Sequence, residues 1–171
     1  TYQLVKVLAE QDIRIRLIHN ETNLGAAGSR NRAFQLCRGT YIALLDSDDR
    51  WEPTKLEKQL LCAKATGASI VYCSYAIIGP DGEKRCPDFI VPPRTTYDTM
   101  LVRSTISCST ALLHRDLIEQ YHFPDNVYHE DYAYWLTLLR NGAVAIGLNE
   151  VLASYRVTAG SRASNKLKSA I

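Results

Sequence analysis

The chain has 171 residues, 46% of them hydrophobic and 22% charged, and these values are typical of one soluble globular domain. They exclude a disordered tail, a collagen-like repeat and a coiled coil. With 20 Lys and Arg against 18 Asp and Glu, the formal net charge is only +2 and the basic residues are scattered, which argues against a nucleic-acid binder. The five cysteines are odd in number and form no Cys-x-x-Cys pair, so we expect free thiols in a reducing compartment.

Hydrophobic periodicity divides the chain into alternating helices and strands. In chain order we expect a helix over residues 1–11, a strand over 13–18, a loop over 20–25, a helix over 26–37, a strand over 41–45, a helix from Pro53 to Gly67, a strand over 69–78, a strand over 108–113, a short helix from Asp116, a helix over 130–141, and strands over 143–147 and 151–155. Pro80-Asp81-Gly82 indicates a turn that folds the chain back, and residues 83–105 carry no clear pattern. Alternating strands and helices predict an α/β domain with a mainly parallel sheet, whose ligands lie at the carboxyl ends of the strands.

Two of the expected helices in the first half of the chain carry a distinct apolar stripe. The stripes are Leu4, Val7 and Leu8 in the first helix, and Leu56, Leu60 and Leu61 in the helix after Pro53. No capping residue precedes the first helix, so we expect the native chain to begin upstream of Thr1.

Three carboxylates follow the apolar strand over 41–45 without a break. Asp46, Asp48 and Asp49 lie within four residues, and packing them together costs repulsion unless a cation offsets it. Hard divalent cations such as Mg²⁺ or Mn²⁺ take carboxylate and phosphate oxygens, so the abrupt change from strand to acids favours a metal–phosphate site. The alternative is a solvated acidic loop that caps the helix at Pro53.

Two further segments have the composition of ligand-binding loops. The segment from Asn23 to Asn31 leads from a glycine-bearing loop into a helix, where backbone can approach an anion closely. Glu130 and Asp131 open an amphipathic helix. Each segment also has a purely structural interpretation, since glycines are common at helix junctions and acids are common in a first helical turn.

Taken together, these segments resemble the family 2 glycosyltransferases. The matching residues are Asn23 to Asn31, with Ser29 in place of the family's usual Ala; Asp46-Ser47-Asp48, as the DxD signature, followed by Asp49, Trp51, Pro53 and Leu56; Glu130-Asp131 followed by Trp135; and Tyr155-Arg156 with Ser161. The family's opening strands, which hold the nucleotide base and ribose, have no counterpart before residue 11. The resemblance therefore implies one glycosyltransferase domain over 1–171 that is incomplete at its N-terminal end, with residues 159–171 as a tail.

The resemblance implies the GT-A fold, a three-layer α/β/α sandwich, and transfer of a sugar from a nucleotide-diphosphate donor to an acceptor hydroxyl with inversion. UDP is the expected nucleotide, and Mn²⁺ or Mg²⁺ the expected cofactor. The implied roles are general base for Asp131, metal ligand for Asp48, donor binding for Asn23, Gly25, Arg30, Asp46 and Arg156, and support for Asp49 and Glu130. For Arg156 a structural ion pair is the alternative, for Arg30 a brace of the acidic loop or an ordinary surface position, and His114 is expected to be structural.

The implied acceptor is a saccharide or a lipid-linked saccharide, as in cell-surface polysaccharide or lipopolysaccharide synthesis. No apolar run approaches the roughly 20 residues that span a bilayer, so we expect a cytoplasmic protein that associates peripherally with the inner face of the membrane. Two other functions stay open. One is a non-catalytic nucleotide-sugar-fold module. The other is an aspartate-dependent phosphohydrolase, which needs a downstream catalytic lysine and is disfavoured because Lys84 is isolated in a turn.

Overall fold

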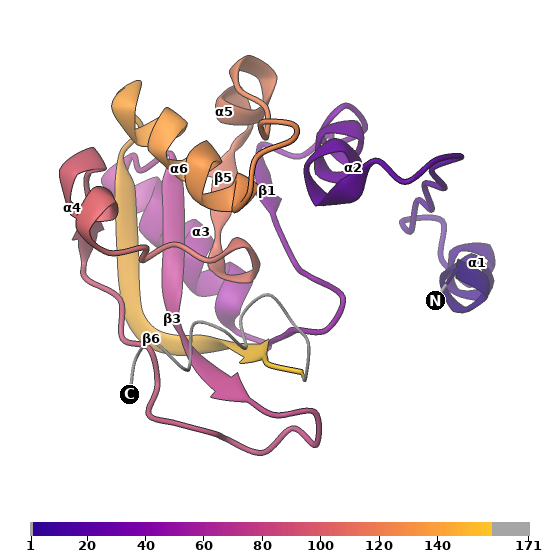
Figure 1. Ribbon diagram of the computed structural model, residues 1–171, viewed down its shortest axis with the longest axis horizontal. Helices are drawn as coiled ribbons and strands as arrows, with labels where there is room; N and C mark the ends of the chain where they lie inside the picture. The colour runs from indigo at the N-terminus through magenta and orange to yellow at the C-terminus, as the bar shows by residue number, and fades with distance from the viewer. Residues whose placement is uncertain (1, 159–171) are drawn as a thin grey trace.

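The computed structural model describes residues 2–158, and within that range the chain alternates between helices and strands (Figure 1). In chain order the elements are α1 (Tyr2–Gln11), α2 (Gly25–Phe34), β1 (Tyr41–Ala43), β2 (Arg50–Trp51), α3 (Lys55–Thr66), β3 (Ile70–Ile78), β4 (Arg94–Thr95), α4 (Tyr97–Val102), the 3₁₀ helix η1 (Cys108–Thr110), β5 (Leu112–His114), α5 (Arg115–Gln120), α6 (Glu130–Arg140) and β6 (Ala145–Arg156). The predicted α/β class is confirmed.

The six strands form one sheet in the order β1-β5-β3-β6-β2, with β4 paired to β6. β1, β3 and β6 run in the same direction, but only β3 and β6 are parallel neighbours, because β5 lies between β1 and β3 and runs against both. β2 and β4 are antiparallel to β6. The expectation of a mainly parallel sheet is therefore wrong for the described residues. The order of elements along the chain does not fix the direction of β5, because the long segment over 79–111 between β3 and β5 can return the chain to either edge of the sheet.

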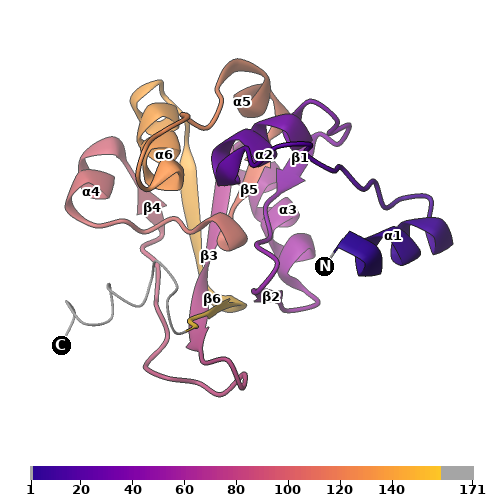
Figure 2. The ribbon, with the colours of Figure 1, turned by 45° about the vertical axis from the view of Figure 1, so that its right-hand side comes forward.

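Helices cover both faces of this sheet, which makes the three layers that the sequence predicts. Alternate residues of β3 point to opposite faces: Ile70 and Tyr72 join the large core beneath α2, α4, α5 and α6, whereas Val71 packs with Ala63 of α3. Trp135 of α6 is fully buried in the large core. Figures 1 and 2 show α3 behind the sheet and α6 in front of it.

Two strand predictions are wrong in detail. Residues 13–18 form no strand: Ile13 is 96% exposed, and a turn closes from the amide of Ile15 to the carbonyl of Asp12. The two strands expected over 143–147 and 151–155 are one strand, β6, which stays paired to β3 through register shifts around Ser74. Alternation of side chains marks a strand only where another strand pairs with it.

The leucine stripe expected on α3 is wrong at two of its three positions, since only Leu60 packs against the core. Leu56 and Leu61 are exposed, and the residues that this helix buries are Lys55, Gln59 and Ala63. Two polar side chains thus occupy the sheet-facing side of α3, and they require hydrogen-bond partners inside the protein. The predicted end of this helix is confirmed, since Gly67 is its left-handed C-cap with φ of +68°.

The helix predicted at the start of the chain is confirmed as α1, which lies apart from the layers in both views (Figures 1 and 2). None of its residues is buried, and Leu4 is 66% exposed. The turn predicted after β3 is confirmed as well, because isolated antiparallel bridges pair Ile78 with Lys84 and Tyr75 with Phe89. The predicted tail over 159–171, with Ser161, lies outside the described residues.

Candidate functional site

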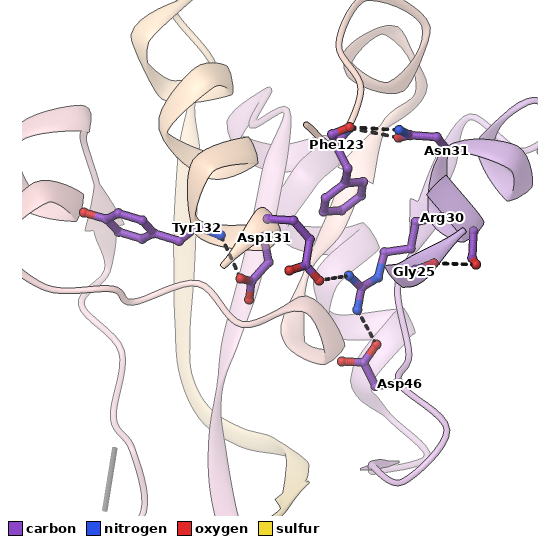
Figure 3. A network of polar contacts seen from close by, with 9 residues as sticks. Gly25, Arg30, Asn31, Asp46, Phe123, Asp131 and Tyr132 are labelled. Atoms are coloured by element: carbon purple, nitrogen blue, oxygen red, sulfur yellow. Dashed lines mark hydrogen bonds and ion pairs between the residues drawn. The ribbon is translucent and has the colours of Figure 1, made fainter. Parts of the chain in front are cut away.

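Arg30 joins the three segments that the sequence analysis singled out. Its Nη2 donates to Oδ1 of Asp46 at 2.7 Å and its Nη1 donates to Oε1 of Glu130 at 3.1 Å (Figure 3). The Arg30 side chain is 19% exposed and its guanidinium lies 5.3 Å from the centre of the Phe123 ring. Burial by itself lowers the pKa of Arg30. Nearby negative groups, Asp46 and Glu130 among them, have the larger effect and raise that pKa above its usual value. A charged arginine therefore holds α2, the acidic loop and the start of α6 together.

The acidic loop, residues 46–49, follows β1 and lies where three strands end. The amide of Asp46 donates to Oγ of Ser109 at 3.0 Å, and Oδ1 of Asp49 accepts from the amide of Arg156 at 2.8 Å. Asp49 is buried, and burial raises its pKa above the usual value. Asp48 is exposed. The loop thus presents one carboxylate to Arg30, buries one, and leaves one at the surface.

Arg156, at the end of β6, holds the acidic loop through backbone carbonyls. Its Nε donates to the carbonyl of Asp48 at 2.9 Å, and its Nη1 donates to the carbonyls of Gly79 and Pro80 at 2.8 and 3.0 Å. The side chain therefore ties the loop to the turn after β3. The ion pair that we weighed as the alternative to donor binding is not what the structure shows for Arg156, since its guanidinium partners are carbonyls.

The chain turns sharply into α6. His129 adopts φ of +61°, in the left-handed region that side chains other than glycine rarely enter. Glu130 then faces Arg30 with its side chain 12% exposed, and Oδ1 of Asp131 accepts from the amide of Tyr132 at 2.9 Å (Figure 3). The hydroxyl of Tyr132 donates to the carbonyl of Met100 at 3.2 Å, which links the start of α6 to α4.

Asn31 fixes the approach to α6 from the neighbouring helix α2. Its Nδ2 donates to the carbonyl of Phe123 and its Oδ1 accepts from the amide of the same residue, both at 2.8 Å (Figure 3). Phe123 is buried and stacks on Tyr134 with ring centres 4.1 Å apart. This two-bond clamp places the segment before Glu130 relative to Arg30.

A large cavity lies beside this site rather than at the acidic loop. It has a volume of about 920 Å³ and is lined by Asn23, Leu24, Gly25, Ala26, Ala27, Gly28, Asn31, Arg32, Gln35, Pro124, Asp125, Asn126, Val127 and Glu130. Oδ1 of Asn23 accepts from the amide of Gly25 at 2.9 Å, and Gly25 has φ of +67°. Asn23 and Gly25 therefore line a cavity that meets the Arg30 network at Glu130, and Asp46, Asp48 and Arg156 do not line it.

Whether a divalent cation can bind at the acidic loop depends on the partners that its three carboxylates already have. Asp46 is paired with Arg30, and Asp49 is bonded to a backbone amide. Within residues 2–158 no group of three or more His, Cys, Asp and Glu side chains could hold a metal ion by itself. Asp48 is exposed and can offer one carboxylate, which together with phosphate oxygens is a donor set that Mg²⁺ and Mn²⁺ accept. The residues therefore fit a metal that a phosphate ligand brings to Asp48.

Four residues around this site, Trp51, Lys55, Gln59 and Ser109, were not among the predicted site residues. Trp51 donates from Nε1 to the carbonyl of Ser109 at 2.6 Å, and Gln59 donates to the carbonyl of Thr110 at 2.8 Å. Lys55 donates to Gln59 at 2.7 Å. Their sequence signal was weak, because residues 108–113 read as a plain strand and a lysine on a helix reads as a surface residue. By contrast, His114 has the structural role that we expected, since its Nδ1 accepts from the amide of Asp116 at the start of α5.

Comparison with known proteins gives consistent matches. The sequence profile of "Glycosyl transferase family 2" matches residues 1–121. The chain is 36% identical over 170 residues to TuaG of Bacillus subtilis, which is named for teichuronic acid biosynthesis, covering 99% of this chain and 68% of that protein. It is 39% identical over 164 residues to WfgD of Escherichia coli, a UDP-Glc:alpha-D-GlcNAc-diphosphoundecaprenol beta-1,3-glucosyltransferase, covering 95% of this chain and 64% of that protein.

Solved structures match over nearly the whole chain at low identity. Staphylococcus aureus TarS 1-349 in complex with UDP-GlcNAc has a TM-score of 0.73 at 17% identity, over 96% of this chain and 49% of that one. The mannosyltransferase PcManGT from Pyrobaculum calidifontis, in complex with GDP-Man and Mn²⁺, has a TM-score of 0.69 at 18% identity, over 98% of this chain and 47% of that one. The chain thus spans about two thirds of the relatives' length and half of the solved chains. Within residues 2–158, no helix has the length and apolar character needed to cross a membrane.

Proposed function

Because the chain belongs to glycosyl transferase family 2, and has the GT-A-like α/β fold expected of it, we propose that it transfers a sugar from a nucleotide-diphosphate donor to an acceptor hydroxyl with inversion. The observation that carries this proposal is the Arg30 bridge between Asp46 and Glu130. It brings the acidic loop and the first turn of α6 into one site, so that groups for the donor and for the acceptor lie on either side of one arginine.

The reaction assigns one step to each side of the site. The acceptor oxygen forms a bond to the anomeric carbon as the bond from that carbon to the diphosphate breaks, and the hydroxyl proton must pass to a base on the acceptor side. Asp131 is the proposed base. Its Oδ1 is held by the amide of Tyr132, which fixes the carboxylate in one orientation. Asp46 is proposed to contact the donor's ribose or sugar.

The remaining residues hold these two carboxylates in place. Glu130 and Arg30 keep α6 at a set distance from the acidic loop, and Asp49 anchors that loop to the amide of Arg156. Arg156 is proposed to affect donor binding indirectly, because it braces the acidic loop that lies beside the diphosphate. Asn23 and Gly25 are proposed to bind the donor from the cavity side.

Asp48 would hold Mn²⁺ or Mg²⁺ together with the donor's diphosphate oxygens. Such an ion neutralises charge on the leaving diphosphate when it is bound. PcManGT, which shares the fold, was solved with Mn²⁺. The cation is expected to bind weakly without nucleotide, because this chain supplies it with one free carboxylate of the loop.

The acceptor is proposed to be a lipid-linked saccharide of a cell-surface polysaccharide pathway, with UDP-glucose as the first donor to test. The support is the acceptor and donor printed in the name of WfgD, and the polysaccharide in that of TuaG. A lipid-linked acceptor would bring the protein to the cytoplasmic face of a membrane.

Calorimetry with UDP and Mn²⁺, together and singly, tests the proposal directly. We expect UDP to bind tightly only with Mn²⁺, and we expect Asp48→Ala to abolish this dependence while Asp116→Ala, an exposed carboxylate on α5, leaves it unchanged. Removing one of three clustered acids should not destabilise the apo protein. If neither UDP nor Mn²⁺ gives a measurable heat of binding, alone or together, a non-catalytic module would be favoured. Release of phosphate from simple phosphomonoesters would favour the hydrolase, although Lys84 forms an ion pair with Asp88.

A further inference from the structure

The sheet-facing side of α3 contains a buried lysine and a buried glutamine. Lys55 and Gln59 are both 0% exposed. Nζ of Lys55 donates to Oε1 of Gln59 at 2.7 Å and lies 4.1 Å from the centre of a Trp51 ring. Within residues 2–158 this ammonium group forms no salt bridge. Burying a charged group that has no partner of opposite charge is costly, so packing alone does not explain a lysine at this position.

The contact with Lys55 sets the orientation of the Gln59 amide. Because Oε1 accepts from Lys55, the amide nitrogen must point the other way. Nε2 there donates to the carbonyls of Val71 and Thr110, at 2.9 and 2.8 Å. Gln59 therefore ties α3 to β3 and to the short turn η1 at the same time.

Trp51 makes a second connection from Lys55 to the same turn. Its ring lies under the ammonium group, and its Nε1 donates to the carbonyl of Ser109 at 2.6 Å. Ser109 in turn uses its Oγ to accept from the amide of Asp46 at 3.0 Å. Both connections that start at Lys55 thus end on adjacent residues of η1, and this turn holds the backbone of the carboxylate that meets Arg30.

We propose that Lys55 and Gln59 are positioning residues, which fix η1 and thereby hold Asp46 in place beside Arg30. The partners of the two side chains lie outside the acidic loop, so their effect passes through Trp51, Ser109 and Thr110. A fully bonded buried polar network specifies one arrangement of its neighbours, whereas an apolar contact allows several. The proposal deepens the proposed function. The kinetic prediction below rests on that function, whereas the exchange prediction does not.

Amide hydrogen exchange tests the positioning without any substrate. Lys55→Met keeps an unbranched side chain that is one atom shorter, and it removes the donor to Gln59. Gln59→Glu keeps the size and an acceptor for Lys55, but removes the amide donors to Val71 and Thr110. Lys64→Met, an exposed lysine of the same helix, is the matched control. In both test variants we expect exchange to become about tenfold faster at residues 44–49 and 108–111, as the loss of one net hydrogen bond implies, with α6 unchanged.

Steady-state kinetics with the full-length protein then separate positioning from a loss of folded enzyme. We expect the KM for the nucleotide sugar to rise about tenfold, since a small displacement of a binding group is costly, while the KM for the acceptor stays constant. A smaller folded fraction would instead lower kcat at unchanged KM.

The proposal is overturned if exchange at residues 44–49 is unchanged in a folded variant. If Lys55→Met fails to fold, the exchange result for Gln59→Glu decides between the two outcomes. Trp51→Phe tests the other connection, because it removes the Nε1 donor and keeps an aromatic ring. If the wild-type protein transfers no sugar at all, the proposed function fails, but the exchange result still decides whether Lys55 and Gln59 position Asp46.

Discussion

Asp131 and Glu130 are neighbours in sequence with different surroundings. Glu130 is bonded to Arg30, whereas Oδ1 of Asp131 accepts from the Tyr132 amide. A residue that accepts a proton needs an oxygen free of strong donors, and a residue that positions a helix needs a charged partner. The contacts therefore support the division of roles that we propose, with Asp131 as the base and Glu130 as its support.

Replacing Asp131 with Asn should cut turnover by roughly a hundredfold or more, the usual contribution of a general base. Asn keeps the size of the side chain and an oxygen for the amide of Tyr132, so nucleotide affinity should stay near the wild-type value. Steady-state transfer with the full-length protein and a lipid-linked acceptor measures the turnover. Calorimetry with UDP and Mn²⁺ measures the nucleotide affinity. Glu130→Gln should have a smaller effect on turnover. Transfer by Asp131→Asn at close to the wild-type rate would place the base elsewhere.

The buried Lys55 should make stability depend on pH. Burial lowers the pKa of its ammonium group to about 8, from 10.5 in the unfolded chain, although Cys73 acts weakly in the opposite direction. Between these values the unfolded chain binds more protons than the folded protein, so the free energy of unfolding rises with pH across that window. The full effect of a shift of this size is about 3 kcal/mol.

Urea unfolding between pH 7 and pH 10.5 measures this dependence. We expect the wild type to gain stability relative to Lys55→Met as the pH rises, because methionine has no proton to lose. Lys64→Met should follow the wild-type curve. Tyrosines that titrate in the same range are present in all three proteins, so their contribution to stability cancels when the curves are compared. Curves for wild type and Lys55→Met that run parallel would show that Lys55 has an ordinary pKa.

At the scale of elements, α2 organises the start of α6. It sends Arg30 to Glu130 and Asn31 to the backbone of Phe123, so two adjacent residues hold the first turn of α6 and the segment before it. The helix α1, by contrast, buries none of its residues within the described part of the chain. Helices of similar length therefore differ in what they contribute to the site.

Asn31→Ala should lower the free energy of unfolding by about 2 kcal/mol, because it leaves the amide and the carbonyl of buried Phe123 without their partner. Chemical denaturation measures the loss, and faster exchange of the Phe123 amide locates it. Gln35→Ala, an exposed position just after the same helix, is the control and should change little. Equal stability of Asn31→Ala and Gln35→Ala would mean that the clamp does not form in solution.

At the scale of the whole molecule, the site joins segments from both halves of the chain around one sheet. The partners of Arg30 lie 16 and 100 residues away, and the partner of Arg156 in the acidic loop lies more than a hundred residues back. A ligand that bridges the loop and its surroundings should therefore stabilise the entire fold, since it binds only when these segments are assembled.

Thermal denaturation should show this linkage. UDP and Mn²⁺ together, at about 100 times the dissociation constant, should add about 2.7 kcal/mol to the free energy of unfolding and raise the Tm. UDP alone or Mn²⁺ alone should have a much smaller effect, and EDTA should remove the gain. An equal rise with UDP in EDTA would show that binding needs no divalent cation.

Several features of this protein were predictable from sequence because they depend on neighbours along the chain. The helices α1 and α6, the buried start of β3 and the left-handed stop at Gly67 follow from local periodicity and from glycine's freedom of φ. Four segments in the right order, Asn23 to Asn31, the acidic loop, Glu130-Asp131 and Tyr155-Arg156, supported the resemblance to family 2 glycosyltransferases, which the comparisons confirm.

Only the tertiary structure decided which polar groups meet. Hydrophobic periodicity predicted Leu56 and Leu61 in the core, yet α3 buries Lys55 and Gln59, because carbonyls of β3 and η1 bond to Gln59 and Gln59 bonds to Lys55. The direction of β5 and the continuity of β6 were likewise set by pairing between distant segments. A hydrogen bond between residues far apart in sequence leaves no periodic signal in either segment, so the geometry around Arg30 appears only when the chain is folded.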